Sequence, residues 1–341
     1  MKKFTAFCCF TMFAGLAVQV SGQRKQPLRL VQTIPIPNIH GHIDHMDADV
    51  EGKRLFVPAL ASDSLEVVDL AAGKHIRSIP GFKTPAGAWY VRELNKLFVA
   101  SRGDGMVRVF RGDTLDLIDS IKLELGPNRL IYDPASGHLY VGYGADFAGF
   151  AYGRVGIIDV RSDKLLGDII VEGYHPSDIL LDNTTGRIIV SNALGARVDE
   201  FNPKDRQLVL TWPARGKNAN DIGLDQTHRR VFVGTRKPPE MTVYDSDSGQ
   251  EVAYFPTVEN MDGVYYDARL RRVYVSGGTD DGGSVYVYQQ KDADDYELIG
   301  KIPTRPNANT SHWVPGLNQY FVAAPANDKQ EATILVFEPQ P

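Results

Sequence analysis

Residues 40–47 (HGHIDHMD) bring together three of the eight histidines and two aspartates. Neutral imidazole nitrogens and carboxylate oxygens are good ligands for Zn²⁺ and similar divalent ions. A divalent metal ion is therefore a candidate cofactor, with His42, Asp44, His45 and the distant His312 as candidate ligands. The spacing matches no metal signature known to us, and the alternative is hydrogen bonding within an exposed loop. If the segment is a strand, His42 and Asp44 point to one side and His45 to the other.

Further polar candidates recur at positions that a sequence repeat makes equivalent. We find them by counting ten residues back from each of seven apolar triplets; in the last repeat we take the turn to be two residues shorter. The aligned residues are His45, Gly87, Arg129, Asp178, Asp221, Gly263 and His312. The preceding residues include Asn128, Asn220 and Asp262. Such groups converging on one channel mouth predict a site for a small polar ligand or an ion. The alternative is that these side chains only form hydrogen bonds with the loops and the water that fill the channel.

Arginines after the triplets could extend this site. Arg102 and Arg236, with Arg129, have the planar guanidinium that binds a carboxylate or phosphate through two parallel hydrogen bonds. The alternative for each is ordinary surface charge. No Gly-x-Ser-x-Gly elbow, phosphate-binding glycine loop or metalloprotease histidine pair accompanies them. A catalytic set is therefore not identified.

The triplets themselves predict the fold that must position these residues. They are Leu55-Phe56-Val57, Leu97-Phe98-Val99, Leu139-Tyr140-Val141, Ile188-Ile189-Val190, Val231-Phe232-Val233, Val273-Tyr274-Val275 and Tyr320-Phe321-Val322. A period in the forties with about four short strands per unit is typical of a β-propeller. We expect an all-β, seven-bladed propeller of four-stranded antiparallel blades. The expected blades span about 43–79, 85–121, 127–169, 175–212, 219–255, 261–302 and 309–339.

Each triplet is expected to be a second strand buried on both faces, and each fourth strand an exposed, charged edge. The last unit lacks a fourth strand, and residues 28–36 have the pattern of one. We therefore predict that this N-terminal strand completes the last blade and closes the ring. Insertions at 144–153 and 277–283 are expected on loops of the binding face. Phe147, Phe150 and Tyr152 in the first insertion could anchor a partner protein or cap a blade.

Residues 1–22 have the pattern of a secretory signal peptide. Lys2 and Lys3 precede an apolar run from Phe4 to Val20, and cleavage is expected near Gln23. The alternative is an uncleaved anchor, for which this run is marginally short. Both cysteines lie in the leader, so a mature single domain of 23–341 would hold no disulfide or thiolate site. We expect a secreted, periplasmic or extracellular protein with no membrane span after cleavage.

The charge argues against nucleic acid as a partner. The net charge is −5 with no basic tail or stripe, whereas nucleic-acid binding favours a clustered positive surface. The 43% apolar content is enough for a packed interior. We expect a monomer.

The repeat resembles the YVTN-type units of bacterial secreted seven-bladed propellers across residues 29–339. The resemblance is carried by the triplets, by third strands such as Val67-Val68-Asp69, Ile157-Ile158-Asp159 and Val243-Tyr244-Asp245, and by turns such as Asp182-Asn183-Thr184-Thr185-Gly186-Arg187. It implies the propeller fold and leaves the function open. Related propellers include sugar-lactone hydrolases, surface-layer proteins and a periplasmic DNA-binding protein, and no lactonase catalytic set can be placed on this sequence.

Three functional hypotheses follow. The favoured one is a binding or protein-interaction scaffold, not an enzyme, that holds a small polar ligand, an ion or a partner protein over the channel mouth. The second is a metal-assisted hydrolase of the lactonase type, in which an ion held by His45 and His312 polarises a carbonyl and activates water, with Asp178 or Asp221 as ligand or base. The third is an interaction module built on outer strands or insertion loops.

Overall fold

The computed structural model describes residues 26–144, 149, 152–173 and 175–341. The predicted leader and the predicted aromatic anchors Phe147 and Phe150 lie outside these residues. No helix in the described part of the chain is long and apolar enough to cross a membrane.

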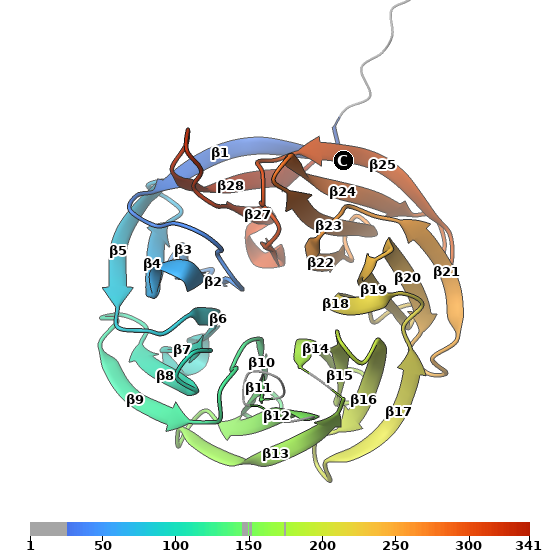
Figure 1. Cartoon of the computed structure of the whole chain (residues 1–341), viewed down its shortest axis with the longest axis horizontal. Coiled ribbons are helices and arrows are strands. Elements are labelled where there is room, and N and C mark those ends of the chain that lie inside the picture. Colours follow the sequence, from blue (N-terminus) through green and yellow to red (C-terminus); the bar gives the residue numbers. More distant parts are fainter. Residues whose placement is uncertain (1–25, 145–148, 150–151, 174) are drawn as a thin grey trace, which may run out of the picture.

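Seven four-stranded antiparallel sheets are arranged as blades around one axis (Figure 1), which confirms the seven-bladed propeller. Six blades run in chain order from an inner to an outer strand. Blade 1 contains β2 (Asp47–Asp49), β3 (Arg54–Ala59), β4 (Ser64–Asp69) and β5 (Lys74–Pro80). Blade 2 contains β6 (Pro85–Val91), β7 (Lys96–Ser101), β8 (Met106–Arg111) and β9 (Leu117–Lys122). Blade 3 contains β10 (Leu130–Asp133), β11 (His138–Gly144), β12 (Tyr152–Asp159) and β13 (Lys164–Glu172).

The remaining blades repeat this plan. Blade 4 contains β14 (Pro176–Asp182), β15 (Arg187–Asn192), β16 (Arg197–Asn202) and β17 (Gln207–Pro213). Blade 5 contains β18 (Lys217–Asp225), β19 (Arg230–Lys237), β20 (Pro239–Asp245) and β21 (Glu251–Pro256). Blade 6 contains β22 (Met261–Asp267), β23 (Arg272–Thr279), β24 (Gly282–Gln290) and β25 (Tyr296–Pro303). Short 3₁₀ turns occur at η1 (Leu60–Ser62), η2 (Arg92–Leu94) and η4 (Pro315–Leu317).

The two ends of the chain form blade 7 together. Its strands are β26 (Ser311–Val314), β27 (Gln319–Ala324), β28 (Ala332–Pro339) and, outermost, β1 (Leu28–Ile36). The pairing of β1 with β28 runs from Leu28 opposite Pro339 to Ile36 opposite Ala332. In Figure 1 the blue β1 lies along the red β28. The predicted closure of the ring by the N-terminal strand is confirmed.

The apolar triplets are the buried second strands, as predicted, and they build a core between every pair of neighbouring blades. Leu55 and Val57 pack toward blade 7, in the cluster that also holds Ile34 and Phe321. Phe56 points the other way, into the cluster shared with blade 2. This alternation follows from the two-residue period of a strand with both faces covered. The ring is therefore held by contacts between blades as well as by β1.

Candidate site at the channel mouth

A cavity of about 500 Å³ opens where the loops leading into the inner strands meet the loops that follow the second strands. Among the residues that the structure describes, its lining is almost entirely polar, with no Phe, Tyr or Trp and with only two apolar residues. The lining residues are His42, Asp44, His45, Arg102, Asn128, His175, Ser177, Ala193, Leu194, Asn218, Asn220, Arg236, Asn260, Asp262 and Asn309. All seven blades contribute to it, so it belongs to the mouth of the ring and not to one interface.

Irregularities of the inner strands aim these side chains inward. The pairing register shifts between Pro176 and Asp178, between Ala219 and Ile222, and between Met261 and Gly263. A bulge leaves an extra residue on one strand and re-aims its side chain. Blades 4, 5 and 6 can therefore direct consecutive residues to the mouth. Simple alternation, which placed His45 opposite His42 and Asp44, fails for blade 1 too, because residues 42–44 are not strand and all three residues line the cavity.

The backbone at the start of β18 and in the loop before β22 explains two of the asparagines. Asn218 and Asn260 have φ angles of 56° and 49°, in the left-handed region. Asparagine adopts this conformation more readily than most residues. Each lies three residues before the equivalent inner-strand position, so a turn requirement also places an amide at the cavity wall.

Asp44 anchors the network on the blade 1 side of the cavity. Its Oδ2 accepts a hydrogen bond from Arg102 Nη2 at 3.0 Å, and the backbone N–H of His45 donates to its Oδ1 at 3.0 Å. Arg102 Nη2 also donates to Asn128 Oδ1 at 2.8 Å, and Asn128 Nδ2 lies 3.2 Å from His175 Nε2. Four side chains from blades 1 to 4 are thus held in one chain of hydrogen bonds.

Asp262 anchors a second network on the side of blades 5 to 7. Arg236 Nη2 and Asn220 Nδ2 donate to its Oδ1 at 2.6 and 2.8 Å, and the Thr310 hydroxyl donates to its Oδ2 at 2.9 Å. Asn220 Nδ2 also donates to Asp221 Oδ1 at 3.0 Å. These contacts join blades 5, 6 and 7 at the mouth.

Behind the lining, Arg129 links Asp178 to His45, two of the predicted site residues. Its Nε forms an ion pair with the buried Asp178 at 2.7 Å, and its Nη1 lies 3.0 Å from His45 Nδ1. Because a guanidinium can only donate, His45 Nδ1 is the acceptor and Nε2 carries the proton. That Nε2 lies 3.4 Å from Asp44 Oδ1. His45 therefore joins Arg129 to Asp44 and does not offer a free nitrogen to an ion.

Burial and neighbouring charges set the ionisation of this site. Desolvation, reinforced by Arg129, lowers the pKa of His45, and desolvation with Arg102 lowers the pKa of His175 to about 3. Burial, Asp178 and Asp262 raise the pKa of Asp221 well above its usual value. Burial opposes ionisation of Asp262, but Arg236, His42, His45 and Thr310 outweigh it and lower its pKa. Near neutral pH His45 and His175 are therefore uncharged.

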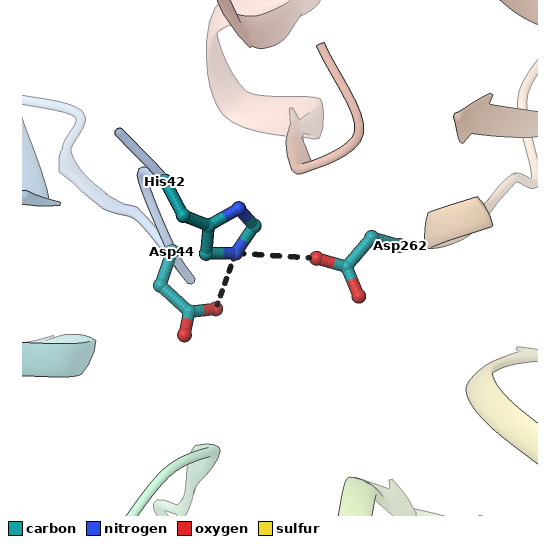
Figure 2. A group of neighbouring side chains, drawn as sticks. All are labelled: His42, Asp44 and Asp262. Atoms are coloured by element: carbon teal, nitrogen blue, oxygen red, sulfur yellow. Dashed lines mark ion pairs between the residues drawn. The ribbon is translucent and has the colours of Figure 1, made fainter. Parts of the chain in front are cut away.

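His42 lies between the two anchoring carboxylates, as Figure 2 shows. Its Nε2 is 3.6 Å from Asp262 Oδ2 and 3.9 Å from Asp44 Oδ1. One ligand atom from each of the three residues falls within 4.8 Å of the others. Of the four predicted metal ligands, His42 and Asp44 thus come together, and Asp262 joins them.

The placement of His312 at the mouth is wrong. His312 pairs with Phe321, the middle residue of its triplet, just as Asp47 pairs with Phe56. The turn in blade 7 is not shorter than the others, and the counterpart of His45 is Thr310. His312 lies two residues further along the inner strand. Its Nε2 is 3.4 Å from Asp47 Oδ1, and its ring packs edge-on against Tyr265. It is therefore not part of the candidate metal group.

The structure brings most of the other predicted site residues together. His42, Asp44, His45, Arg102, Asn128, Asn220, Arg236 and Asp262 line the cavity. Behind them, Arg129 contacts His45, Asp221 contacts Asn220, and Asp178 pairs with Arg129. Sequence reasoning missed His175 and Asn260 in the lead-in loops, Asn218 near the start of β18, and Asn309. An unshifted count of ten in the last repeat finds Asn309, immediately before Thr310.

Comparisons with known proteins show the fold alone. No family model matches the chain, and no curated protein sequence matches it. A chain of a structure described as the crystal structure of the mitotic checkpoint complex superposes with a TM-score of 0.76 at 10% identity, covering 99% of each chain. Hydrazine synthase of Kuenenia stuttgartiensis superposes with a TM-score of 0.73 at 14% identity, covering 87% of this chain and 97% of that one. Both support the propeller fold, and the YVTN resemblance stays a prediction.

Proposed function

We propose that this propeller is a binding protein whose channel mouth holds one small polar ligand. The observation that carries the proposal is the roughly 500 Å³ cavity, whose side chains are held in place before any ligand arrives. Cavities of a few hundred Å³ with convergent polar groups are typical of small-molecule sites. Because the hydrogen-bond networks fix the lining, little conformational entropy is lost on binding.

The charges of the mouth favour a neutral or zwitterionic ligand. Asp44, Asp178 and Asp262 are paired with Arg102, Arg129 and Arg236 at 3.0, 2.7 and 2.6 Å. Each positive charge is thus matched by a negative one, and a dianion would have to displace a carboxylate from its arginine. Amide, hydroxyl and imidazole groups remain to bind hydroxyl and carbonyl groups. We infer a compact polyhydroxyl or amino-acid-like molecule.

A thermal-shift panel tests this ligand class. Chelator-treated protein is heated with monosaccharides and polyols, with amino acids, with dicarboxylates and phosphate esters, and with apolar compounds of similar size. A ligand that binds only the folded state raises the midpoint of unfolding. We expect stabilisation by a member of the first two groups. Stabilisation confined to dianions or apolar compounds, or none across the panel, would contradict the proposal.

Export and the alternative functions rest on the sequence. We propose a secreted or periplasmic location from the predicted leader at residues 1–22 alone. A partner protein that inserts a polar loop into the same mouth is compatible with the proposal. The lactonase alternative needs an ion with an open coordination position, so the metal measurements below bear on it.

A further inference from the structure

We propose that the mouth binds a divalent transition-metal ion, such as Zn²⁺, through His42 Nε2, Asp44 Oδ1, Asp262 Oδ2 and the side-chain oxygen of Asn309. This inference rests on the proposed function, because it names the ion as part of what the same cavity binds. It differs from the ligand set expected from the sequence, in which His45 and His312 were central. In the structure both of those residues make other contacts.

The distances around His42 fit a shared ion better than hydrogen bonds. Its Nε2 is 3.6 and 3.9 Å from the two carboxylate oxygens, whereas hydrogen bonds of this kind are about 2.7–3.2 Å long. Ligands about 2.1 Å from one ion lie about 3.0–3.4 Å apart. The ligand atoms of His42, Asp44 and Asp262, which all lie within 4.8 Å of one another, would draw together on the ion. The His42 side chain is 38% exposed on a lead-in loop, so it can make this movement.

Asn309 provides an independent observation. In the observed register Asp262, Asn309 and Asp44 occupy equivalent positions on blades 6, 7 and 1, so the asparagine stands between the two carboxylates in the ring. It is 7% exposed and lines the cavity, and within the described chain its Oδ1 accepts no hydrogen bond. A buried amide oxygen without a partner is costly. A bound metal ion would give this oxygen a partner, once rotation about χ2 of Asn309 turns it toward the ion.

The surrounding groups orient the carboxylates. Arg102 donates to Oδ2 of Asp44, and Arg236 with Asn220 donates to Oδ1 of Asp262, while the other oxygen of each carboxylate faces His42. Asp44 Oδ1 also accepts a hydrogen bond from the backbone N–H of His45 at 3.0 Å. The Thr310 hydroxyl contacts the second Asp262 oxygen. Outer hydrogen bonds of this type are a general feature of metal sites. One imidazole with oxygen donors suits a transition ion such as Zn²⁺ better than Ca²⁺, which prefers oxygen ligands alone.

The test titrates Zn²⁺ and Ca²⁺ into chelator-treated, untagged protein by calorimetry, with Co²⁺ absorption as a spectroscopic check. We expect one Zn²⁺ per chain and weaker binding of Ca²⁺. His42→Ala and Asn309→Ala should each weaken Zn²⁺ binding by about tenfold or more. His40→Ala is the matched control, because His40 is an exposed histidine on the same loop that hydrogen-bonds with Ser62, and it should bind as the wild type does.

Defined outcomes would overturn the inference. These are no Zn²⁺ binding by the wild type, unchanged binding by His42→Ala, or equal loss in His40→Ala; unchanged binding by Asn309→Ala would overturn the role of that amide. Circular dichroism confirms that each variant is folded. The polar panel is run without metal, so a failed Zn²⁺ titration beside a positive panel rejects the ion and keeps the ligand site. The reverse pair of results rejects the ligand proposal and keeps the ion.

Discussion

At the scale of single residues, the mouth combines buried ionic pairs with histidines kept neutral by burial. His175 is the extreme case, because desolvation and the nearby Arg102 lower its pKa to about 3. In the unfolded chain a histidine takes up its proton near pH 6.5. Between these values the unfolded state binds more protons than the folded state, so stability falls as the pH falls.

We predict that His175→Gln reduces the acid sensitivity of the fold. Between pH 7 and pH 5 the wild type should lose up to about 2 kcal/mol of unfolding free energy through this group, and the variant should be spared that part. Urea denaturation at the two pH values measures the change in unfolding free energy for each protein. Comparing this change between wild type and variant cancels the contribution of the other titrating groups. His40→Gln on the exposed loop should keep the wild-type difference. Equal losses in His175→Gln and wild type would show that the group is not held neutral.

At the scale of elements, repeated patterns were predictable and local irregularities were not. The triplets predicted the buried second strands and the ring because seven copies of one pattern reinforce one another. The residues at the mouth depend on bulges, such as the one between Met261 and Gly263, and on the length of a single turn. A shift of two residues exchanged Thr310 for His312, since alternate residues of a strand share a face but differ in depth. The same two-residue shift is the reason why the sequence analysis did not identify Asn309.

The closing strand β1 gives a prediction at this scale. Ile34 is completely buried in the cluster between blades 7 and 1, so Ile34→Ala should cost about 2–5 kcal/mol of unfolding free energy. Leu30 lies on the same strand but is 50% exposed, so Leu30→Ala should change stability by less than about 0.5 kcal/mol. Urea unfolding compares the two. Equal effects would mean that β1 adds little to the core beyond its backbone pairing.

At the scale of the whole molecule, the fold brings polar groups from all seven blades to one end of the ring. Neither a single blade nor a local motif contains the site, so no short sequence pattern identifies it. The blade-to-blade cores hold the inner strands, and the paired arginines and aspartates hold the lining. The account's central claim is that this cavity is where the ligand binds.

The most direct measurement is calorimetric titration of the best compound from the panel into a variant with a blocked mouth. Leu194 lines the cavity and is 53% exposed, so Leu194→Trp should fill the mouth without disturbing the core. Leu208→Trp is the matched control, on the outer strand β17 of the same blade with 50% exposure. We predict one site per chain in the wild type and in Leu208→Trp, and at least a tenfold loss of affinity, about 1.4 kcal/mol, in Leu194→Trp. Wild-type affinity in folded Leu194→Trp would contradict the account.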